Sequence, residues 1–189
     1  MTTVSEENSL ASLVTKAQSG DRDAMEHLVA QIRPRVFRYV LARVLDPHTA
    51  DDVTQEVTVT MVQSLHRYVD QGRPVVAWVF GIAANKVSES RRATGRRRES
   101  LTELAPEHAA DATLEPEQAL LRLEASAQVA ALLDTLPLQQ AEILRLRVAA
   151  GLSAEETAAV LDMTPGAVRV AQHRALSKLR ATSTPDRAS

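Results

Sequence analysis

Residues 151–180 read GLSAEETAAVLDMTPGAVRVAQHRALSKLR, and this stretch decides the fold of the C-terminal part of the chain. Ser153 and Glu156 fit a capping box, in which the serine hydroxyl accepts a hydrogen bond from the third helical N–H while the glutamate reaches back to the serine N–H. A short helix from this cap to Leu161 is therefore predicted.

A tight turn and a second helix are predicted to follow. Asp162-Met163 can form the turn, and Thr164-Pro165 supplies a hydroxyl cap and a proline in the first helical turn. The second helix should therefore begin at Pro165. A short helix, a short turn and a longer helix make a helix-turn-helix.

The second helix has an apolar face and a polar face. Val168, Ala175 and Leu179 can pack inward, which leaves side chains on or beside the outward face that suit base reading in a major groove. These side chains are Arg169, Gln172, His173 and Arg174. From spacing alone, an ordinary helical hairpin with solvated arginines remains the alternative.

The rest of the chain also favours helices. Aromatic residues make up 3% of it and no long stretch alternates apolar with polar residues, so strands are not indicated. Gly20 should end a first helix and Asp21 should cap a second, while Pro34 and Pro47 should bracket a third. We therefore expect an all-α fold.

Two further helices are predicted in the N-terminal half, and one opens the C-terminal half. A fourth should begin at or near Asp51, with a stripe of inward residues, and be broken by Gly72 and Pro74. The inward residues of this helix are Val53, Val57, Met61, Leu65 and Tyr68. A fifth should run from about Val75 into the arginines of 91–98. A helix through Leu120, Leu123, Val129 and Leu133 should break at Pro137.

Composition limits the class of protein. The 189 residues include no cysteine and five scattered histidines, so disulfides and structural zinc are not expected. There is neither a secretory leader nor an apolar run approaching about 18 residues, so we expect no membrane insertion and a cytoplasmic location. No cofactor and no catalytic or metal-binding residues are expected.

The net charge of −2 is unevenly distributed. Residues 1–98 carry 14 Lys and Arg against 11 Asp and Glu, residues 99–117 carry none against 6, and residues 118–189 carry 8 against 7. The segment 99–117 is rich in Glu, Ala, Pro and Thr, which suits a solvated linker. We therefore expect two small helical domains, 8–98 and 118–182, joined by a flexible acidic linker.

The N-terminal half contains two candidate binding surfaces. Asp52, Gln55 and Glu56 share one helix face, which suits a protein partner or is a plain solvated face. Downstream, Asn85 follows an apolar segment, and a tract of arginines suits nucleic-acid phosphates or the carbonyls of a helix end. The tract comprises Arg91, Arg92, Arg96, Arg97 and Arg98.

Together these segments resemble the extracytoplasmic-function sigma factors, the two-domain group of the sigma-70 family, over roughly residues 8–181. The run Ala77-Trp78-Val79-Phe80-Gly81-Ile82-Ala83-Ala84-Asn85 resembles a segment of the family's first domain, and residues 151–175 resemble its −35-binding helix-turn-helix. The run Val168-Arg169-Val170-Ala171-Gln172-His173-Arg174-Ala175-Leu176 is most similar to the actinobacterial SigD-like subgroup.

The resemblance implies an RNA polymerase sigma factor that binds core polymerase, recognises −35 and −10 promoter elements and promotes initiation without being an enzyme. Asp52, Gln55 and Glu56 would bind the clamp helices of the largest polymerase subunit, and the flap would be a second contact. Asn85 would lie in a loop that reads a flipped −10 base, with the arginines of 91–98 beside it. The −35 contacts would be Arg147, Thr164, Arg169, Gln172, His173 and Arg174. An anti-sigma protein is a candidate partner.

The chain departs from the family at two places. Asp162 stands where many members have a turn glycine, and because aspartate tolerates the left-handed turn the fold should survive. Val170-Ala171 stands where many have Ser-Arg, and the lost arginine removes one contact, so a departure from the usual −35 consensus is expected. Two other interpretations are a helix-turn-helix regulator that binds DNA as a dimer, and an enzyme. The first does not explain Asp52, Gln55 and Glu56, and the second lacks a nucleophile, a phosphate loop and a useful His–carboxylate pair.

Overall fold

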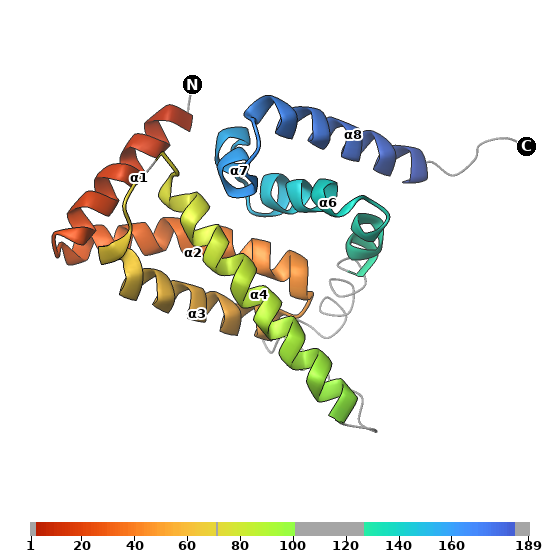
Figure 1. The fold of residues 1–189 in the computed structure, drawn as a ribbon, viewed down its shortest axis with the longest axis horizontal. Coiled ribbons are helices and arrows are strands. Elements are labelled where there is room, and N and C mark those ends of the chain that lie inside the picture. Colours follow the sequence, from red (N-terminus) through yellow and green to blue (C-terminus); the bar gives the residue numbers. More distant parts are fainter. Residues whose placement is uncertain (1–2, 71, 101–126, 184–189) are drawn as a thin grey trace, which may run out of the picture.

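The computed structural model describes residues 3–70, 72–100 and 127–183, and every regular element within these ranges is helical (Figure 1). The N-terminal half consists of α1 (Thr3–Gln18), α2 (Arg22–Val44), α3 (Pro47–Ser64), the 3₁₀ turn η1 (Leu65–Arg67) and α4 (Val75–Ser100). The C-terminal half contains a helix over 127–134, α6 (Leu138–Leu144), the π-helical turn η2 (Arg145–Ala149), α7 (Ala154–Leu161) and α8 (Pro165–Ser183). The all-α prediction is confirmed, whereas nearly all of the predicted linker 99–117 lies outside the described residues.

The junction of α1 and α2 forms where the sequence predicted it. Gly20 adopts φ +95°, a left-handed conformation that costs glycine little, and the Asp21 side chain accepts from the Ala24 N–H at 3.0 Å. The Gln18 side chain then donates to the carbonyls of Leu65 and Tyr68, at 2.9 and 2.7 Å. This joins the end of α1 to the loop after α3.

The predicted boundary at Pro34 is wrong, because α2 is one helix that passes through this proline. A proline inside a helix removes one backbone hydrogen bond and costs about 3 kcal/mol. Ile32 and Val36, on either side of Pro34, are both buried in the same core. Burial of this continuous apolar face offsets the cost of the proline.

The predicted bounds of the next helix also need correction. Helix α3 begins at Pro47, before the predicted Asp51, because the Asp46 side chain accepts from the Thr49 N–H at 2.8 Å and proline suits the first turn. It ends at Ser64, well before Gly72. The inward residues are as predicted, with Val53, Val57, Met61 and Leu65 buried and Tyr68 half-buried against Trp78.

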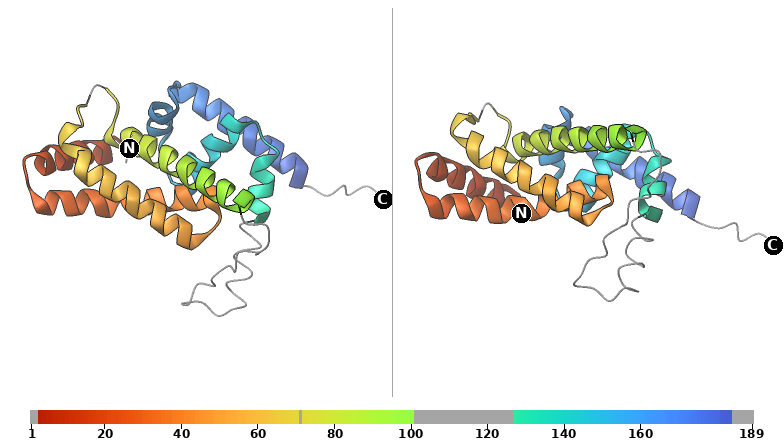
Figure 2. Two further views of the ribbon diagram at one scale, coloured as in Figure 1. Left: turned by 60° about the horizontal axis from the view of Figure 1, so that its bottom comes forward. Right: turned by 90° about the horizontal axis from the view of Figure 1, so that it is seen from below.

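The two halves of the chain pack against each other, which the sequence did not predict (Figures 1 and 2). Leu146, Ala150 and Leu152 belong to the same buried apolar cluster as the cores of α1–α4. Two smaller clusters, built from α6, α7, α8 and the end of the 127–134 helix, complete the C-terminal half.

Polar contacts reinforce this packing. Arg35 of α2 pairs with Glu156 of α7 at 2.5 Å, and the two side chains are only 19% and 8% exposed. Arg38 donates to the carbonyls of Ala149 and Ala150. These contacts join η2 and the start of α7 to α2, while α7 also packs against α4.

A third contact is centred on Glu142 of α6. This carboxylate pairs with Arg43 at 2.5 Å and accepts from the Tyr39 hydroxyl at 2.7 Å. Burial and the adjacent Glu142 carboxylate raise the pKa of Tyr39, so its hydroxyl stays protonated and donates.

Within the described residues, no helix is long and apolar enough to span a membrane.

Candidate nucleic-acid and polymerase interfaces

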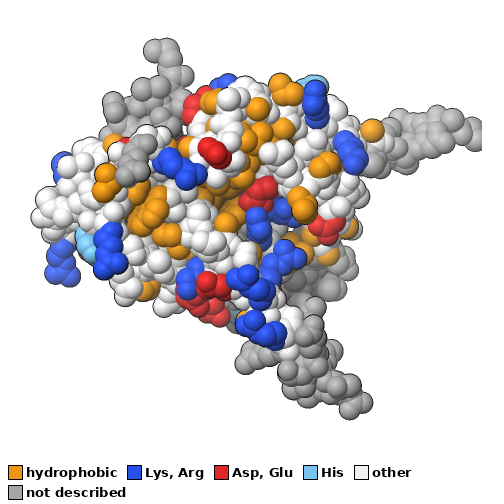
Figure 3. Space-filling model, in the orientation of Figure 1, with side chains coloured by type: hydrophobic (Ala, Val, Ile, Leu, Met, Phe, Trp, Pro, Cys, Tyr) orange, Lys and Arg blue, Asp and Glu red, His pale blue; other side chains and the backbone are white. Residues whose placement is uncertain are grey.

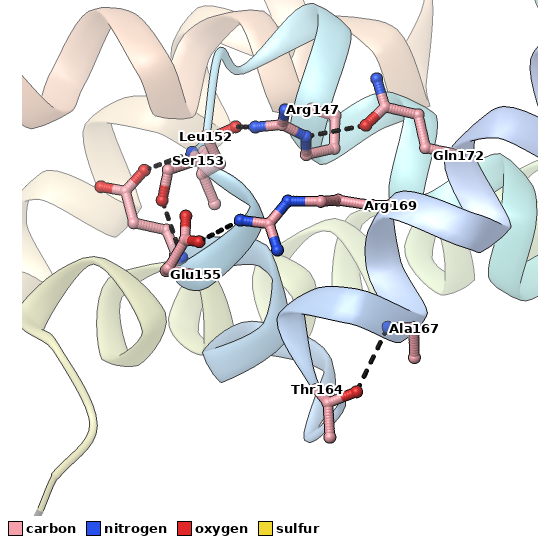
Figure 4. Close-up of polar contacts among 9 residues, drawn as sticks. Arg147, Leu152, Ser153, Glu155, Thr164, Ala167, Arg169 and Gln172 are labelled. Carbon is pink, nitrogen blue, oxygen red and sulfur yellow. Dashed lines mark hydrogen bonds and ion pairs between the residues drawn. The ribbon is translucent and has the colours of Figure 1, made fainter. Parts of the chain in front are cut away.

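The helix-turn-helix forms through the local hydrogen bonds predicted for it (Figure 4). The Ser153 hydroxyl accepts from the Glu156 N–H at 3.0 Å, and the Glu156 carboxylate accepts from the Ser153 N–H at 2.7 Å. This reciprocal pair confirms the capping box at the start of α7. Glu156 also binds Arg35, so the same carboxylate caps α7 and holds it against α2.

The turn between α7 and α8 depends on Asp162. This residue adopts φ 54° and ψ 50°, the left-handed conformation that aspartate tolerates better than most side chains. The Thr164 hydroxyl then accepts from the Ala167 N–H at 3.2 Å, and α8 begins at Pro165 as predicted. The departure from the family's turn glycine therefore leaves the turn geometry intact.

The predicted division of α8 into two faces is confirmed. Val168 and Ala175 are fully buried, and Leu179 packs against the core of this half. On or beside the other face, Arg169, Val170, His173 and Arg174 are exposed and Gln172 is half-buried.

Two of the predicted DNA contacts are joined to each other. Arg147 of η2 donates to the side-chain oxygen of Gln172 at 2.9 Å and to the Leu152 carbonyl (Figure 4). Both side chains are half-buried. This pair therefore fixes α8 relative to η2. It is less exposed than Arg169 and Arg174 of the same helix-turn-helix.

Arg169 forms an ion pair with Glu155 of α7, and both side chains are about half exposed (Figure 4). The pKa of the Glu155 carboxyl lies below its ordinary value, first because its own backbone N–H donates to it and also because Arg169 lies beside it. The guanidinium is thus aligned at the outer edge of the helix-turn-helix. Arg174 lies five residues further along α8, which is about 1.4 turns.

The acidic face of α3 is exposed as predicted. Asp52, Gln55 and Glu56 point away from the core that Val53 and Val57 enter. Glu56 pairs with Lys86 of α4 at 3.1 Å. Two exposed valines of α3, Val59 and Val62 at 47% and 40% exposure, add apolar area to this helix.

Asn85 lies within α4 and not in a loop as the resemblance implied. Val79, Ala83 and Val87 repeat every four residues and are buried, so the helix continues through this position. The Asn85 side chain is exposed in the helix interior. This amide therefore neither caps the helix nor pairs with a polar group of the core.

The arginine tract begins on the exposed C-terminal part of α4. Arg91, Arg92 and Arg96 are exposed, while the side chains of Arg97 and Arg98 lie outside the described residues. Figure 3 shows Lys and Arg side chains gathered over this part of the molecule.

In the described parts of the chain, no three His, Cys, Asp or Glu side chains are grouped as metal ligands.

Sequence reasoning missed the arginines of α2 that bind the C-terminal half. Arg35, Arg38 and Arg43 lie three to five residues apart on one helix, and this row was the available signal. In the sequence, Val170 differs from most family members, but only the structure shows it as an exposed apolar side chain among exposed polar ones.

Comparison with known proteins defines the class. The family model described as sigma-70 region 2 matches residues 28–97, and the one described as sigma-70, region 4 matches residues 126–179. These are the two DNA-binding domains of RNA polymerase sigma factors. The protein is therefore an initiation factor that binds core polymerase and promoter DNA, and it is not an enzyme.

Individual relatives narrow the family. The ECF RNA polymerase sigma factor SigD of Mycobacterium tuberculosis is 48% identical over 176 residues, which cover 90% of this chain and 82% of the relative. ShbA of Streptomyces griseus, also an ECF sigma factor, is 44% identical over 180 residues, covering 91% and 94%. The chain belongs to the ECF sigma factors of the sigma-70 family and is close to SigD.

Solved structures agree with this assignment. CnrH, solved in complex with the cytosolic domain of CnrY, aligns with a TM-score of 0.63 at 28% identity, covering 90% of this chain and 94% of CnrH. RpoE of Bartonella quintana, solved with the anti-sigma factor NepR, aligns with a TM-score of 0.56 at 20% identity, covering 86% and 98%, and so supports the fold.

Proposed function

We propose that this sigma factor reads the −35 element with the outer face of α8, where Arg169 and Arg174 contact bases and His173 assists. The observation that carries the proposal is the helix-turn-helix itself, in which α8 buries Val168 and Ala175 and leaves the arginines exposed. Arginine donates bidentately to guanine in the major groove. Gln172, Thr164 and Arg147 would then support α8 and contact the adjacent backbone.

The −10 element is assigned to α4. The exposed amide of Asn85 can donate and accept, so it suits a base edge. Arg91, Arg92 and Arg96, with Arg97 and Arg98 beyond them, suit phosphates and give a contact that depends on salt but not on sequence. In this proposal the two domains span residues 8–98 and 118–182, and residues 99–117 are the tether that joins them.

Polymerase docking is assigned to α3. Exposed Asp52, Gln55 and Glu56, beside the exposed Val59, form a surface with a polar centre and an apolar edge that suits the clamp helices of the largest subunit. The flap of the polymerase would contact the C-terminal half.

A sigma factor acts with RNA polymerase on chromosomal promoters, which implies a cytoplasmic location.

An anti-sigma protein is proposed as the inhibitor of this chain. CnrH was solved with the cytosolic domain of CnrY, and RpoE with the anti-sigma factor NepR. Likeness to these chains supports a partner of the same kind here.

The docking assignment is tested by reversing two charges, Asp52→Lys with Glu56→Lys. Holoenzyme assembly with core polymerase should be lost while the melting temperature hardly changes, because exposed substitutions usually stay within about 0.5 kcal/mol of neutral. Lys86→Glu is the matched control, since it breaks the Glu56–Lys86 pair but keeps the acidic face. Pull-down with core polymerase followed by run-off transcription measures both effects. Normal assembly by the double variant would refute the assignment.

A further inference from the structure

Val170 stands at the centre of the outward face of α8. It follows the buried Val168 by two residues, which is about 200° around the helix, so it points away from the core. Its side chain is 51% exposed. Its neighbours on this face, Arg169, His173 and Arg174, are exposed too. Val170 is therefore the apolar centre of a polar surface.

The fold does not account for a valine at this position. Among the described side chains, the partly buried apolar residues that pack on the cores built from α6–α8 are Leu161, Met163, Ala171, Leu176 and Leu179, and Val170 is not one of them. A β-branched residue is also slightly unfavourable in a helix. The side chain is better explained by what it meets outside the protein.

Gly166 leaves space on the same face. It lies one helical turn before Val170 and is exposed. A Cβ at this position would meet no atom within 4 Å, so packing inside the protein does not require glycine there. A missing side chain at the start of α8 lets DNA approach the helix closely next to Val170.

The chemistry of the major groove identifies the group that Val170 can recognise. Valine has no hydrogen-bond donor or acceptor, so it cannot read the polar edges of the bases. The C5-methyl group of thymine is the apolar feature that base pairs present in this groove. A branched aliphatic side chain beside two arginines thus suits a thymine next to bases that the arginines read.

We propose that Val170 is a specificity-determining residue that selects one thymine of the −35 element by packing against its C5-methyl group. This inference rests on the proposed function, in which α8 lies in the major groove. Ala171 cannot take this role, because it is half-buried and packs against the core. Val170 therefore gives this polar face one apolar contact, which favours thymine at the base pair that it meets.

The test removes the methyl group from the DNA. Each thymine of the −35 element is replaced singly by deoxyuridine, which keeps base pairing, and holoenzyme binding and open-complex formation are measured. For the wild-type holoenzyme, deoxyuridine at one position should lower the affinity for the promoter about fourfold, because burial of one methyl-sized group contributes this much. Val170→Ala should lose a similar factor on the natural promoter and become insensitive to deoxyuridine at that position.

Control variants separate failure of this inference from failure of the proposed function. Val129→Ala removes an equally exposed valine, 56% exposed on the 127–134 helix, and should keep the deoxyuridine effect. The inference about Val170 is wrong if Val170→Ala keeps the deoxyuridine effect too. It is also wrong if no thymine is sensitive to deoxyuridine while Arg169→Ala and Arg174→Ala alter base preference. If the two arginine variants also leave base preference unchanged, α8 does not read the −35 element.

Discussion

Arg147 and Arg169 belong to the same half of the protein but have opposite surroundings. Arg147 is half-buried and binds Gln172 and the Leu152 carbonyl, whereas Arg169 is exposed beside Glu155. The first arginine therefore supports the helix-turn-helix, and the second is available at its outer edge. Substituting each one should separate stability from base reading.

We expect Arg147→Ala to lower the free energy of unfolding by about 1.5–3 kcal/mol, since hydrogen bonds that involve a charged group contribute this much. Arg169→Ala should stay within about 0.5 kcal/mol of the wild type but lose discrimination at one base pair. Urea unfolding and transcription from a −35 library measure the two effects. Unchanged stability of Arg147→Ala, with uniform weakening on all promoters, would make Arg147 a phosphate contact alone.

Asn85 and the arginines after it lie on one helix but should act differently. Because Asn85 is exposed, Asn85→Ala should leave the melting temperature unchanged and alter the preferred −10 base. Arg91→Ala with Arg92→Ala should keep the base preference and reduce the salt slope by about one for each arginine. Transcription from a −10 library at two salt concentrations distinguishes these outcomes. An unchanged base profile for Asn85→Ala would end its base-reading assignment.

The start of α3 is fixed by the Asp46 cap, and α3 carries the proposed docking surface. Partial burial alone would raise the pKa of Asp46, but hydrogen bonds from Thr49 and the nearby His48 hold it below its ordinary value. A lowered pKa means that the folded state favours the ionised carboxylate. Its contribution to stability is present above the unfolded pKa of about 3.9 and is lost as the pH falls through the folded value.

Asp46→Ala should therefore cost about 1 kcal/mol at neutral pH, as is usual for loss of an N-cap. Asp46→Asn keeps a good cap without the charge, so it should lose less and should remove the contribution of this residue to acid sensitivity. Unfolding followed between pH 7 and pH 3 gives both results. Equal acid sensitivity of wild type and Asp46→Asn would show that this carboxylate is not involved.

The packing of the two halves has a consequence for promoter binding. The −35 and −10 elements lie on separate stretches of duplex, whereas η2 and α7 are joined to α2 through Arg35, Arg38 and Glu156, and α7 also packs against α4. We therefore expect the two halves to move apart when both elements are bound, so that the packed arrangement is the state of the free protein.

Arg35→Glu should open the free protein. The new carboxylate would face Glu156 in a mostly buried site, and disruption of such a pair costs about 3–5 kcal/mol. The radius of gyration from X-ray scattering should rise, while transcription by the assembled holoenzyme should be equal or greater. Arg33→Glu is the control, because its pair with Asp51 is exposed and lies within the N-terminal half. A compact Arg35→Glu protein, or loss of its transcription, would contradict this prediction.

Local interactions are the part of this protein that could be predicted from the order of residues. The Ser153 capping box, the Asp162 turn and the Asp21 cap each join groups within about four residues, so the nearest neighbours specify them. The faces of α3 and α8 follow from helical periodicity in the same way. The candidate residues on those faces, such as Glu56 and Arg169, were therefore placed correctly as exposed.

Contacts between distant residues were decided only by the assembled fold. Arg35 and Glu156 are 121 positions apart, and no pattern along the chain states that they meet. Pro34 could be read only as a helix end, because the burial of Ile32 and Val36 that offsets its cost depends on neighbouring helices. Local hydrogen bonds depend on the residues beside them, whereas burial depends on what the remainder of the chain supplies.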